Sequence, residues 1–595
     1  MIDTLVNRLR PLAERVGLFL CACLVVMLTL GGWGWWGFGA DGDYALDMMD
    51  ALRRFQGEIP YRDFIPTYGA LHVHLVAPLF SLGDHTLSVI WIATAFLIWI
   101  QSWMVMRIAG IIRPGWWTIG VGALFLTLCA FPSYGTKFLV GYSQSGFLGS
   151  WLFTLLLVTL IGTKISSVST PFSPRWFLTG VLLGAQLFTK MDAGMAAIFV
   201  GVALLIILLA DRLKRDAIAL LTGYGSVCVG MWTFLWLQGG KPSLIIETAL
   251  EGFFVAGVVR DYALQKRLML LGTLVLASAI AMLVPSLRSR LLQLRPFTSL
   301  GLLLGLPLVF VWDAWRVSRH GSGCDMVGAN YFFCGAVLLV SSRYFVTVWR
   351  CRSIALFQQG GHLWKGIACI IGLAGIARAA LSGWVVLGYY QPALFLVAML
   401  AWRRSWESLS QSRVWGGAGR SRLLTISSVS MVLLIVVSFG KSWCTVRPAM
   451  DLIPFDSPWG KICYPPSFHR DLLFELRRRG TGGYLFSNHL PGVYFHTGMR
   501  CASFHTWSAR VGMSGRYQKQ REEQTLAQFL RLQPRYVVLT DEKYRQFAIP
   551  QFGKDYGIDL WNFIQANYRP IQRFGPPSGK GGSILWEKLP EPGSP

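Results

Sequence analysis

The chain has 595 residues, of which 53% are hydrophobic and only 14% are charged, whereas soluble proteins carry about 25% charged residues. This composition excludes an ordinary soluble enzyme and indicates an α-helical polytopic membrane protein. The 55 Lys and Arg residues outnumber the 30 Asp and Glu residues. In a membrane protein such an excess belongs to cytoplasmic loops, so we expect no nucleic-acid partner.

Apolar runs of about 17 to 25 residues predict about 13 transmembrane helices, of which the fifth looks short. Basic residues are more frequent in the loops on the N-terminal side of these spans than in the short loops on the other side. The positive-inside rule therefore places the N-terminus in the cytoplasm and the C-terminus outside, which is the periplasm for a bacterial inner membrane. The predicted spans are centred near Val25, Phe96, Leu124, Leu155, Val181, Val202, Met231, Val275, Leu304, Ala336, Ile371, Val397 and Leu433.

The composition changes after the last span, because the chain is polar from about Trp443 to its end. This part contains two short runs that are typical of β-strands, Tyr484–Phe486 and Tyr536–Leu539. Helical patterns lie between and after the two runs, which predicts a small α/β layer. We therefore expect a transmembrane domain at 1–443 and a soluble periplasmic α/β domain at 444–595. The helical patterns cover Asp471–Arg479, Glu522–Leu532 and Leu560–Ala566.

The first outer loop, residues 39–85, is too long for a hairpin and is rich in aspartate. Within it, residues 44–55 have apolar Leu46, Met49 and Leu52 at three-residue steps, with charges largely on the other positions. This pattern is typical of an amphipathic helix. We predict that this helix lies on the membrane interface.

Three aspartates of this loop are candidates for chemistry on the outer face of the membrane. Asp41 and Asp43 precede the amphipathic helix, where a carboxylate is also explained by helix capping and by the macrodipole. Asp63 lies in a turn before a second short helix that is predicted to begin near Ala70, and the turn returns Asp63 to the same surface. For Asp63 the alternative is a turn residue that bonds its own backbone.

Several motifs of the chain stand out together. They are Asp41–Tyr44, Gly57–Phe64, Tyr68–Leu71 and Ala77–Phe80 in the first outer loop, the Lys-containing turn Phe188–Gly194, and the acidic helix and strand at Glu523–Leu539. These motifs resemble those of GT-C glycosyltransferases, in particular family 39-like bacterial enzymes related to protein O-mannosyltransferases and to the lipid A aminoarabinose transferase. Such proteins take a sugar from a polyprenyl-phosphate carrier and pass it to an acceptor on the outer side of the membrane. The resemblance implies a GT-C-like fold and a glycosyltransferase.

The resemblance implies an Asp general base and cations that hold the donor phosphate. A carboxylate near the acceptor oxygen can remove its proton, while Arg or Lys stabilises the departing phosphate. Relatives commonly have adjacent acids where Gly42 separates Asp41 from Asp43, so we assign the base first to Asp41 and second to Asp43. Asp63 would orient the acceptor or hold a cation.

Four cations are candidate ligands of the donor phosphate, and each could instead be a snorkelling interfacial cation. Relatives often place an Arg-x-Asp-x-x-His group in a late outer loop, and here only its Arg, Arg378, carries over. Three histidines of the C-terminal region, at spacings of seven and nine, fit no compact metal motif and are predicted to be surface or packing residues. The four cations are Lys190, Arg378, Arg260 and Arg62; the histidines are His489, His496 and His505.

The sequence contains no glycine-rich nucleotide-binding loop, which favours a lipid-linked sugar as donor substrate over a nucleotide cofactor. A divalent metal such as Mg²⁺ or Mn²⁺ would suit the carboxylates, but the sequence does not demand one. The expected partners are membrane lipid, the lipid-linked donor, and a glycan, lipid or protein acceptor. A lipid or glycan transporter or flippase is the alternative, although it should have acids inside the spans. A membrane scaffold with an exterior binding domain is a third reading.

Overall fold

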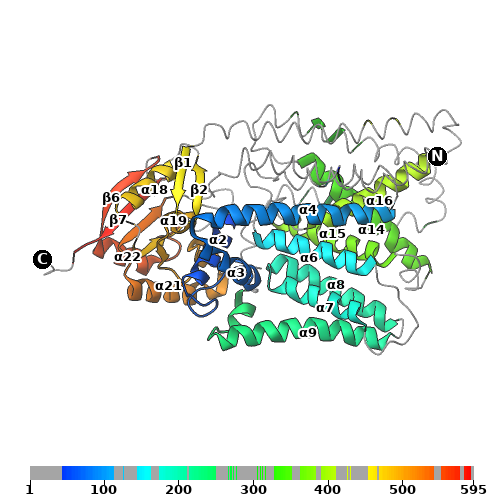
Figure 1. Ribbon diagram of the computed structural model, residues 1–595, viewed down its shortest axis with the longest axis horizontal. Coiled ribbons are helices and arrows are strands. Elements are labelled where there is room, and N and C mark those ends of the chain that lie inside the picture. Colours follow the sequence, from blue (N-terminus) through cyan, green and yellow to red (C-terminus); the bar gives the residue numbers. More distant parts are fainter. Residues whose placement is uncertain are drawn as a thin grey trace.

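The computed structural model is mostly helical and also contains a mixed β-sheet. Long helices form one end of the described part of the chain, an α/β region forms the other end, and two short helices lie between them (Figure 1). Apart from a few single positions, the structure describes residues 43–112, 144–161, 173–210, 213–248, 327–351, 362–382, 390–410, 453–464, 468–480, 482–541, 551–576 and 582–590.

Eight of the predicted spans are long helices in the described residues. The centres of the other five, near Val25, Leu124, Val275, Leu304 and Leu433, lie outside the described residues, so the number of about 13 stays a prediction. The eight helices are α4 (Thr86–Ile112), α6 (Gln144–Ile161), α7 (Pro174–Leu187), α8 (Met191–Ala210), α9 (Lys214–Leu237), α14 (Val327–Cys351), α15 (His362–Ser382) and α16 (Gln391–Ser410).

Three described segments are long and apolar enough to cross a membrane. The first of them bends at Gly83 (φ 56°, ψ −124°), so it consists of short helices followed by the start of α4. Large apolar side chains on α8 and α9 face outward, with Phe199 58% and Trp236 63% exposed, as expected for side chains that contact lipid. The fifth span, α7, has only 14 residues, as predicted. The three segments are Ala70–Ile90, Ala193–Ala210 and Lys214–Leu237.

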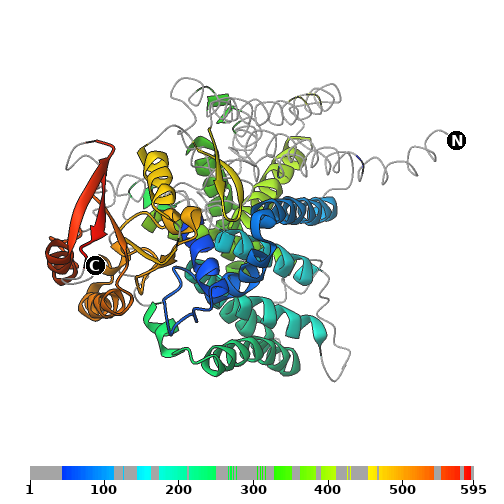
Figure 2. The ribbon, with the colours of Figure 1, turned by 60° about the vertical axis from the view of Figure 1, so that its left-hand side comes forward.

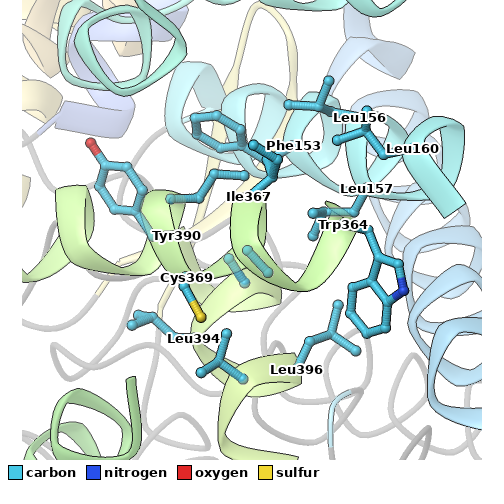
Figure 3. Close-up of a cluster of buried hydrophobic side chains, with 14 of the residues drawn as sticks. Phe153, Leu156, Leu157, Leu160, Trp364, Ile367, Cys369, Tyr390, Leu394 and Leu396 are labelled. Carbon is cyan, nitrogen blue, oxygen red and sulfur yellow. The ribbon is translucent and has the colours of Figure 1, made fainter. Parts of the chain in front are cut away.

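The long helices share an apolar core (Figure 3). Phe153 and Leu157 of α6 pack there with Trp364 and Ile367 of α15 and with Leu394 of α16. Truncating one such buried side chain, as in Leu157→Ala, typically costs about 2–5 kcal/mol of stability. This packing fixes the helix ends from which the loops of the site emerge.

Helices α7 and α9 approach each other closely through two glycines. A Cβ atom on Gly180 would lie 2.1 Å from the carbonyl oxygen of Leu220, and one on Gly223 would lie 2.1 Å from that of Phe177. Small residues at such crossings let two helix backbones come into direct contact. The close crossing of α7 holds the turn at its C-terminal end, which contains Lys190.

The C-terminal region contains a hairpin and a five-stranded sheet in the order β4-β3-β5-β7-β6. Strand β3 is parallel to β4 and β5, while β7 is antiparallel to β5 and β6. Both predicted strands are confirmed as β3 and β5. The strands are β1 (Ile453–Ser457) and β2 (Gly460–Tyr464) of the hairpin, β3 (Tyr484–Ser487), β4 (Arg500–Cys501), β5 (Tyr536–Thr540), β6 (Tyr568–Phe574) and β7 (Ser583–Lys588).

Helices lie before, between and after these strands, and the three predicted helical segments are confirmed as α18, α21 and α22. The predicted boundary between domains, at 443 and 444, lies outside the described residues. The helices are α18 (Phe468–Arg478), α19 (Gly492–Thr497), α20 (Ala509–Gly512), α21 (Gln518–Leu532) and α22 (Ile558–Asn567), with the short 3₁₀ helix η6 (Gly515–Tyr517) before α21.

The first outer loop forms α2 (Asp43–Phe55), α3 (Ala70–Val76) and the 3₁₀ helix η1 (Ala77–His85). Its predicted location on the membrane interface is wrong for α2. Met48, Met49 and Leu52 are buried in one core with Leu472 and Phe495 of the C-terminal region. The opposite, polar face of α2 is also buried. The C-terminal region therefore covers this helix and takes the place of the expected lipid.

Candidate functional site

The turn between α2 and α3 is closed by the carboxylate of Asp63. This carboxylate accepts the N–H of Ile59 at 2.9 Å, and its Oδ2 atom lies 2.6 Å from Nη2 of Arg62. Burial would raise the pKa of Asp63, but the hydrogen bonds from Arg62 and Ile59 outweigh it and lower that pKa. Two of the predicted site residues thus form an ion pair, in which Arg62 remains 46% exposed.

Asp50 connects the first outer loop to the C-terminal region. Its carboxylate accepts the N–H of Thr67 at 2.6 Å and the hydroxyl of Thr506, which follows β4, at 2.5 Å. Arg510 of α20 donates to the carbonyl oxygen of the same Thr67. Burial raises the pKa of Asp50 to about 6, although both hydrogen bonds favour its ionised form. One carboxylate therefore joins α2, the turn and the C-terminal region.

We expect Asp50 to make stability depend on pH. Because its pKa rises from 3.8 to about 6 on folding, folding favours the protonated form, and this stabilisation is complete below about pH 4 and lost as the pH rises through about 6. The shift corresponds to about 3 kcal/mol. In a thermal unfolding series followed by Trp fluorescence, the Tm of the wild type should fall relative to that of Asp50→Asn across this range and then level off.

Asp471→Asn provides the control for this series, because it removes a carboxylate of the same kind from a side chain that is 57% exposed instead of buried. If wild type and Asp50→Asn instead showed the same dependence of Tm on pH, the Asp50 carboxylate would not be buried between α2 and the C-terminal region.

A second buried pair joins α2 to α3. Nε2 of His72 lies 3.1 Å from Oδ1 of Asp47, and both side chains are almost fully buried. Asp43, the first residue of α2, lies one turn before Asp47 and on the same helix face, because residues four apart are neighbours on a helix. The backbone thus places the second candidate base at the start of this face. Asp41, the first candidate, lies outside the described residues.

Arg53 is the buried cation of the first outer loop. Its Nη2 atom lies 2.6 Å from Oε2 of Glu58, and its guanidinium carbon lies 4.4 Å from the centroid of the Phe64 ring. It also donates to the hydroxyl of Thr506 at 3.3 Å. A fully buried Arg requires such a set of partners. Arg53 therefore holds the loop together and binds it to the C-terminal region.

The Lys190 turn is bonded directly to the start of α3. The N–H of Gly69 donates to the carbonyl oxygen of Thr189 at 3.1 Å, and that of Leu71 donates to Phe188 at 2.8 Å. Nζ of Lys190 lies 3.5 Å from the centroid of the Tyr68 ring, a cation–π contact, and Lys190 is only 4% exposed. The Lys190 turn and the first outer loop, which the sequence identified separately, are therefore in contact.

Gly69 is required at this contact, because a Cβ atom there would lie 2.0 Å from the carbonyl oxygen of Phe188. We expect Gly69→Ala to push the Lys190 turn away and to lower the stability by about 1–3 kcal/mol, as overpacking does. The measurement is the apparent Tm of the purified variant. Gly225→Ala on α9 is the control, since a Cβ there meets no atom within 4 Å. An unchanged Tm in Gly69→Ala would contradict the direct contact of these backbones.

Two predicted cations, Arg378 and Arg260, belong to neither the first outer loop nor the Lys190 turn. Arg378 is half-buried in α15, a helix that packs against α6, α8, α14 and α16. Arg260 lies outside the described residues. Asp43, Arg62 and Asp63 belong to the first outer loop, and among the described site residues the structure adds Lys190 to them through its contacts with Tyr68 and Gly69.

Sequence reasoning missed how the C-terminal region completes this site. Arg521 of α21 lies 3.0 Å from Glu247, which follows α9, and this ion pair adds to the contacts of Thr506 and Arg510. The sequence pattern that could have indicated these contacts was the spacing of Asp47 and Asp50. They lie three residues apart on one face of α2, so a second element was needed to pair with them.

The three C-terminal histidines are buried packing residues. Burial, with Arg510 nearby, lowers the pKa of His505 well below its usual range, so this side chain is neutral. The described residues contain no group of three His, Cys, Asp or Glu side chains that could hold a metal ion.

No protein-family model and no curated protein matches the chain, but solved structures do. The archaeal oligosaccharyltransferase AglB from Archaeoglobus fulgidus, in complex with an inhibitory peptide and a dolichol-phosphate, has a TM-score of 0.48 and 12% identity over 96% of this chain and 74% of that one. ArnT from Cupriavidus metallidurans, bound to undecaprenyl phosphate, has a TM-score of 0.44 and 11% identity over 96% of this chain and 97% of that one. Both are GT-C superfamily membrane glycosyltransferases. At this identity and TM-score, the likeness assigns no substrate and no residue role to this chain.

Proposed function

We propose that the chain is an integral membrane glycosyltransferase of the bacterial inner membrane, which moves a sugar from a polyprenyl-phosphate carrier to an acceptor on the periplasmic side. The observation that carries this proposal is the backbone contact between the Lys190 turn and the first outer loop at Gly69 and Leu71. It brings a buried cation to an acid-rich loop, at the place where the long helices meet the α/β region (Figure 2).

The proposed reaction needs one base and a stabilised leaving group. The acceptor oxygen attacks the anomeric carbon of the sugar, the bond from that carbon to the phosphate oxygen breaks, and the acceptor proton passes to a carboxylate. We assign this carboxylate to Asp41 and, as second candidate, to Asp43 at the start of α2. A general base of this kind typically contributes about 10²- to 10⁴-fold in rate.

The lipid phosphate that leaves requires positive charge. Lys190, with Arg378, Arg260 and Arg62, is proposed to supply it. The Tyr68 ring holds the Lys190 ammonium group in place, so this charge needs no reorganisation when the phosphate departs. The cation assigned to Asp63 is Arg62, and their ion pair would orient the guanidinium of Arg62. A divalent metal remains compatible with the carboxylates of the loop.

The experiment that tests the proposed function separates transfer from flipping. The purified chain is reconstituted in proteoliposomes with a polyprenyl-phosphate-linked radiolabelled sugar and with protein, lipid or glycan acceptors outside. We expect a labelled acceptor. Movement of the donor across the bilayer without any labelled product would instead support a flippase, and neither result with any acceptor would support a scaffold.

The proposed topology has a cytoplasmic N-terminus, a transmembrane domain at 1–443 and a periplasmic α/β domain at 444–595. Labelling of single cysteines with a membrane-impermeant maleimide tests it in a chain whose other cysteines are replaced. Arg516→Cys in η6 should react in cells whose inner membrane is intact, because this position is exposed. Arg215→Cys, exposed in the first turn of α9, should react only after that membrane is opened. The opposite pattern would invert the topology.

A further inference from the structure

A pocket of about 80 Å³, partly open to solvent, lies in the α/β region and contains none of the predicted site residues. It is formed by α20 and α21 on one side and by residues 551–557 with the start of α22 on the other. Phe552, Tyr556 and Leu560 contribute apolar surface. Its polar lining consists of Ser508, Lys519, Glu522, Glu523, Thr525 and Asp559.

Thr525 is a buried polar residue in the lining of this pocket. The residue is only 4% exposed, and its Oγ1 atom has no hydrogen-bond partner among the described residues. Leaving a buried hydroxyl without a partner costs about 1–3 kcal/mol. A polar ligand that enters the pocket can form a hydrogen bond with Thr525 in place of water.

The charge of the lining restricts the class of ligand. Three carboxylates, those of Glu522, Glu523 and Asp559, face the single cation of Lys519. They are not arranged as a metal site in the described residues. Excess negative charge disfavours phosphate, sulfate or carboxylate groups, whereas carboxylates accept hydrogen bonds from hydroxyl and ammonium groups.

The apolar part of the lining complements the polar part. An aromatic surface beside a few convergent polar groups is the usual composition of a small-molecule site. A sugar ring has hydroxyl groups at its edge and a C–H face that can pack against Phe552 or Tyr556. With a volume of about 80 Å³ and an open mouth, the pocket takes one edge of a carbohydrate ring, and its lining fits an edge without acidic groups better than it fits an anion or a purely apolar chain.

The pocket is close to the contact between the C-terminal region and the first outer loop. Ser508 lines the pocket, and Thr506, two residues earlier, donates its hydroxyl to Asp50 of α2. The hydroxyl oxygens of Ser508 and Ser503 are 3.2 Å apart, so one hydrogen bond spans this segment. A ligand in the pocket would therefore lie beside the segment that is bonded to the acid-rich loop.

We propose that this pocket binds a neutral or amine-bearing sugar ring of the acceptor, with Thr525 and Asp559 as hydrogen-bonding residues. The assignment to the acceptor rests on the proposed glycosyltransferase function. The pocket thereby restricts the acceptor of the proposed reaction. The part of the acceptor that docks here is a carbohydrate, and its docked ring carries no acidic group.

Saturation-transfer NMR of the full chain in a sugar-free detergent tests the pocket directly, with glucose, glucosamine and glucuronate as probes. We expect saturation transfer to glucose and glucosamine and none to glucuronate. Thr525→Val and Asp559→Asn should each weaken binding about fivefold, the equivalent of about 1 kcal/mol for one hydrogen bond. Asp471→Asn is the matched control, because Asp471 lies in the first turn of α18 as Asp559 does in α22.

The proposal is overturned if none of the sugars binds, if glucuronate binds as well as glucose, or if Asp471→Asn weakens binding as much as the two pocket variants. Its failure is distinguishable from that of the proposed function. Sugar binding in a chain that transfers no sugar would contradict the glycosyltransferase and support the pocket. If Thr525→Val and Asp559→Asn transferred sugar at the wild-type rate and neither they nor the wild type bound the probe sugars, only the proposed sugar pocket would be contradicted.

Discussion

Asp41→Asn is expected to lose sugar transfer by about 10²- to 10⁴-fold, the usual contribution of a general base. Asn has almost the shape of Asp but cannot take the proton of the acceptor hydroxyl, so expression and donor binding should stay close to those of the wild type. The rate of product formation in proteoliposomes measures sugar transfer. Binding of the polyprenyl-phosphate-linked sugar, measured separately, checks that the donor site is intact.

Asp43→Asn decides between the two candidate bases, because only the variant of the true base should lose transfer to this extent. Asp84→Asn provides the matched control, since Asp84 belongs to the same outer loop but its side chain is 78% exposed beside His85. It should transfer sugar at the wild-type rate. Wild-type transfer by both Asp41→Asn and Asp43→Asn would contradict the proposed base and leave another group to take the acceptor proton.

Local sequence patterns predicted most of the described helices, but only β3 and β5 of the seven described strands. The helix expected at 44–55 is α2, Asp43–Phe55, and the helix expected from Ala70 begins there as α3. Such elements could be predicted because a period of 3.6 residues, a turn or a buried β-type run is a property of neighbouring residues.

The surroundings of α2 could not be predicted in this way. An amphipathic pattern is the same whether its apolar face meets lipid or another part of the protein. The hydroxyl of Thr506 that pairs with Asp50 comes from a residue 456 positions away. No periodicity carries information about such a contact, so the sequence did not predict that the charged face of α2 is buried.

The segments of the candidate site could be predicted, but the contact between them could not, because this contact also joins residues that are far apart in the sequence. Resemblance selected the Lys190 turn and the first outer loop, but their contact depends on Gly69, where the absence of a side chain admits the carbonyl oxygen of Phe188. Glycine also occurs in loops wherever a tight turn or a positive φ requires it, so its presence does not by itself predict a close contact. The position of Lys190 against Tyr68 therefore follows from the tertiary structure and not from either segment alone.

Lys190→Met is expected to reduce sugar transfer by about 10²- to 10³-fold, the usual effect of removing one preorganised electrostatic contact. Met has a similar length and an apolar stem, so it can occupy the buried space over the Tyr68 ring. The contacts that Lys190 loses include the cation–π contact, about 2 kcal/mol in a desolvated place, and their loss is offset because a buried charge no longer has to be desolvated. The apparent Tm should therefore change little, while donor binding and the rate of transfer both fall.

Lys365→Met is the matched control for this variant. Lys365 also lies near an aromatic ring, with Nζ 5.8 Å from the centroid of Trp364, but it belongs to α15 and lies outside the first outer loop. It should transfer sugar at the wild-type rate. Tyr68→Leu separates the two roles that Lys190 could have, because it removes the ring and keeps the cation. If Lys190→Met lowered the Tm as much as Tyr68→Leu and left donor binding unchanged, Lys190 would hold the loop in place and another cation would have to meet the phosphate.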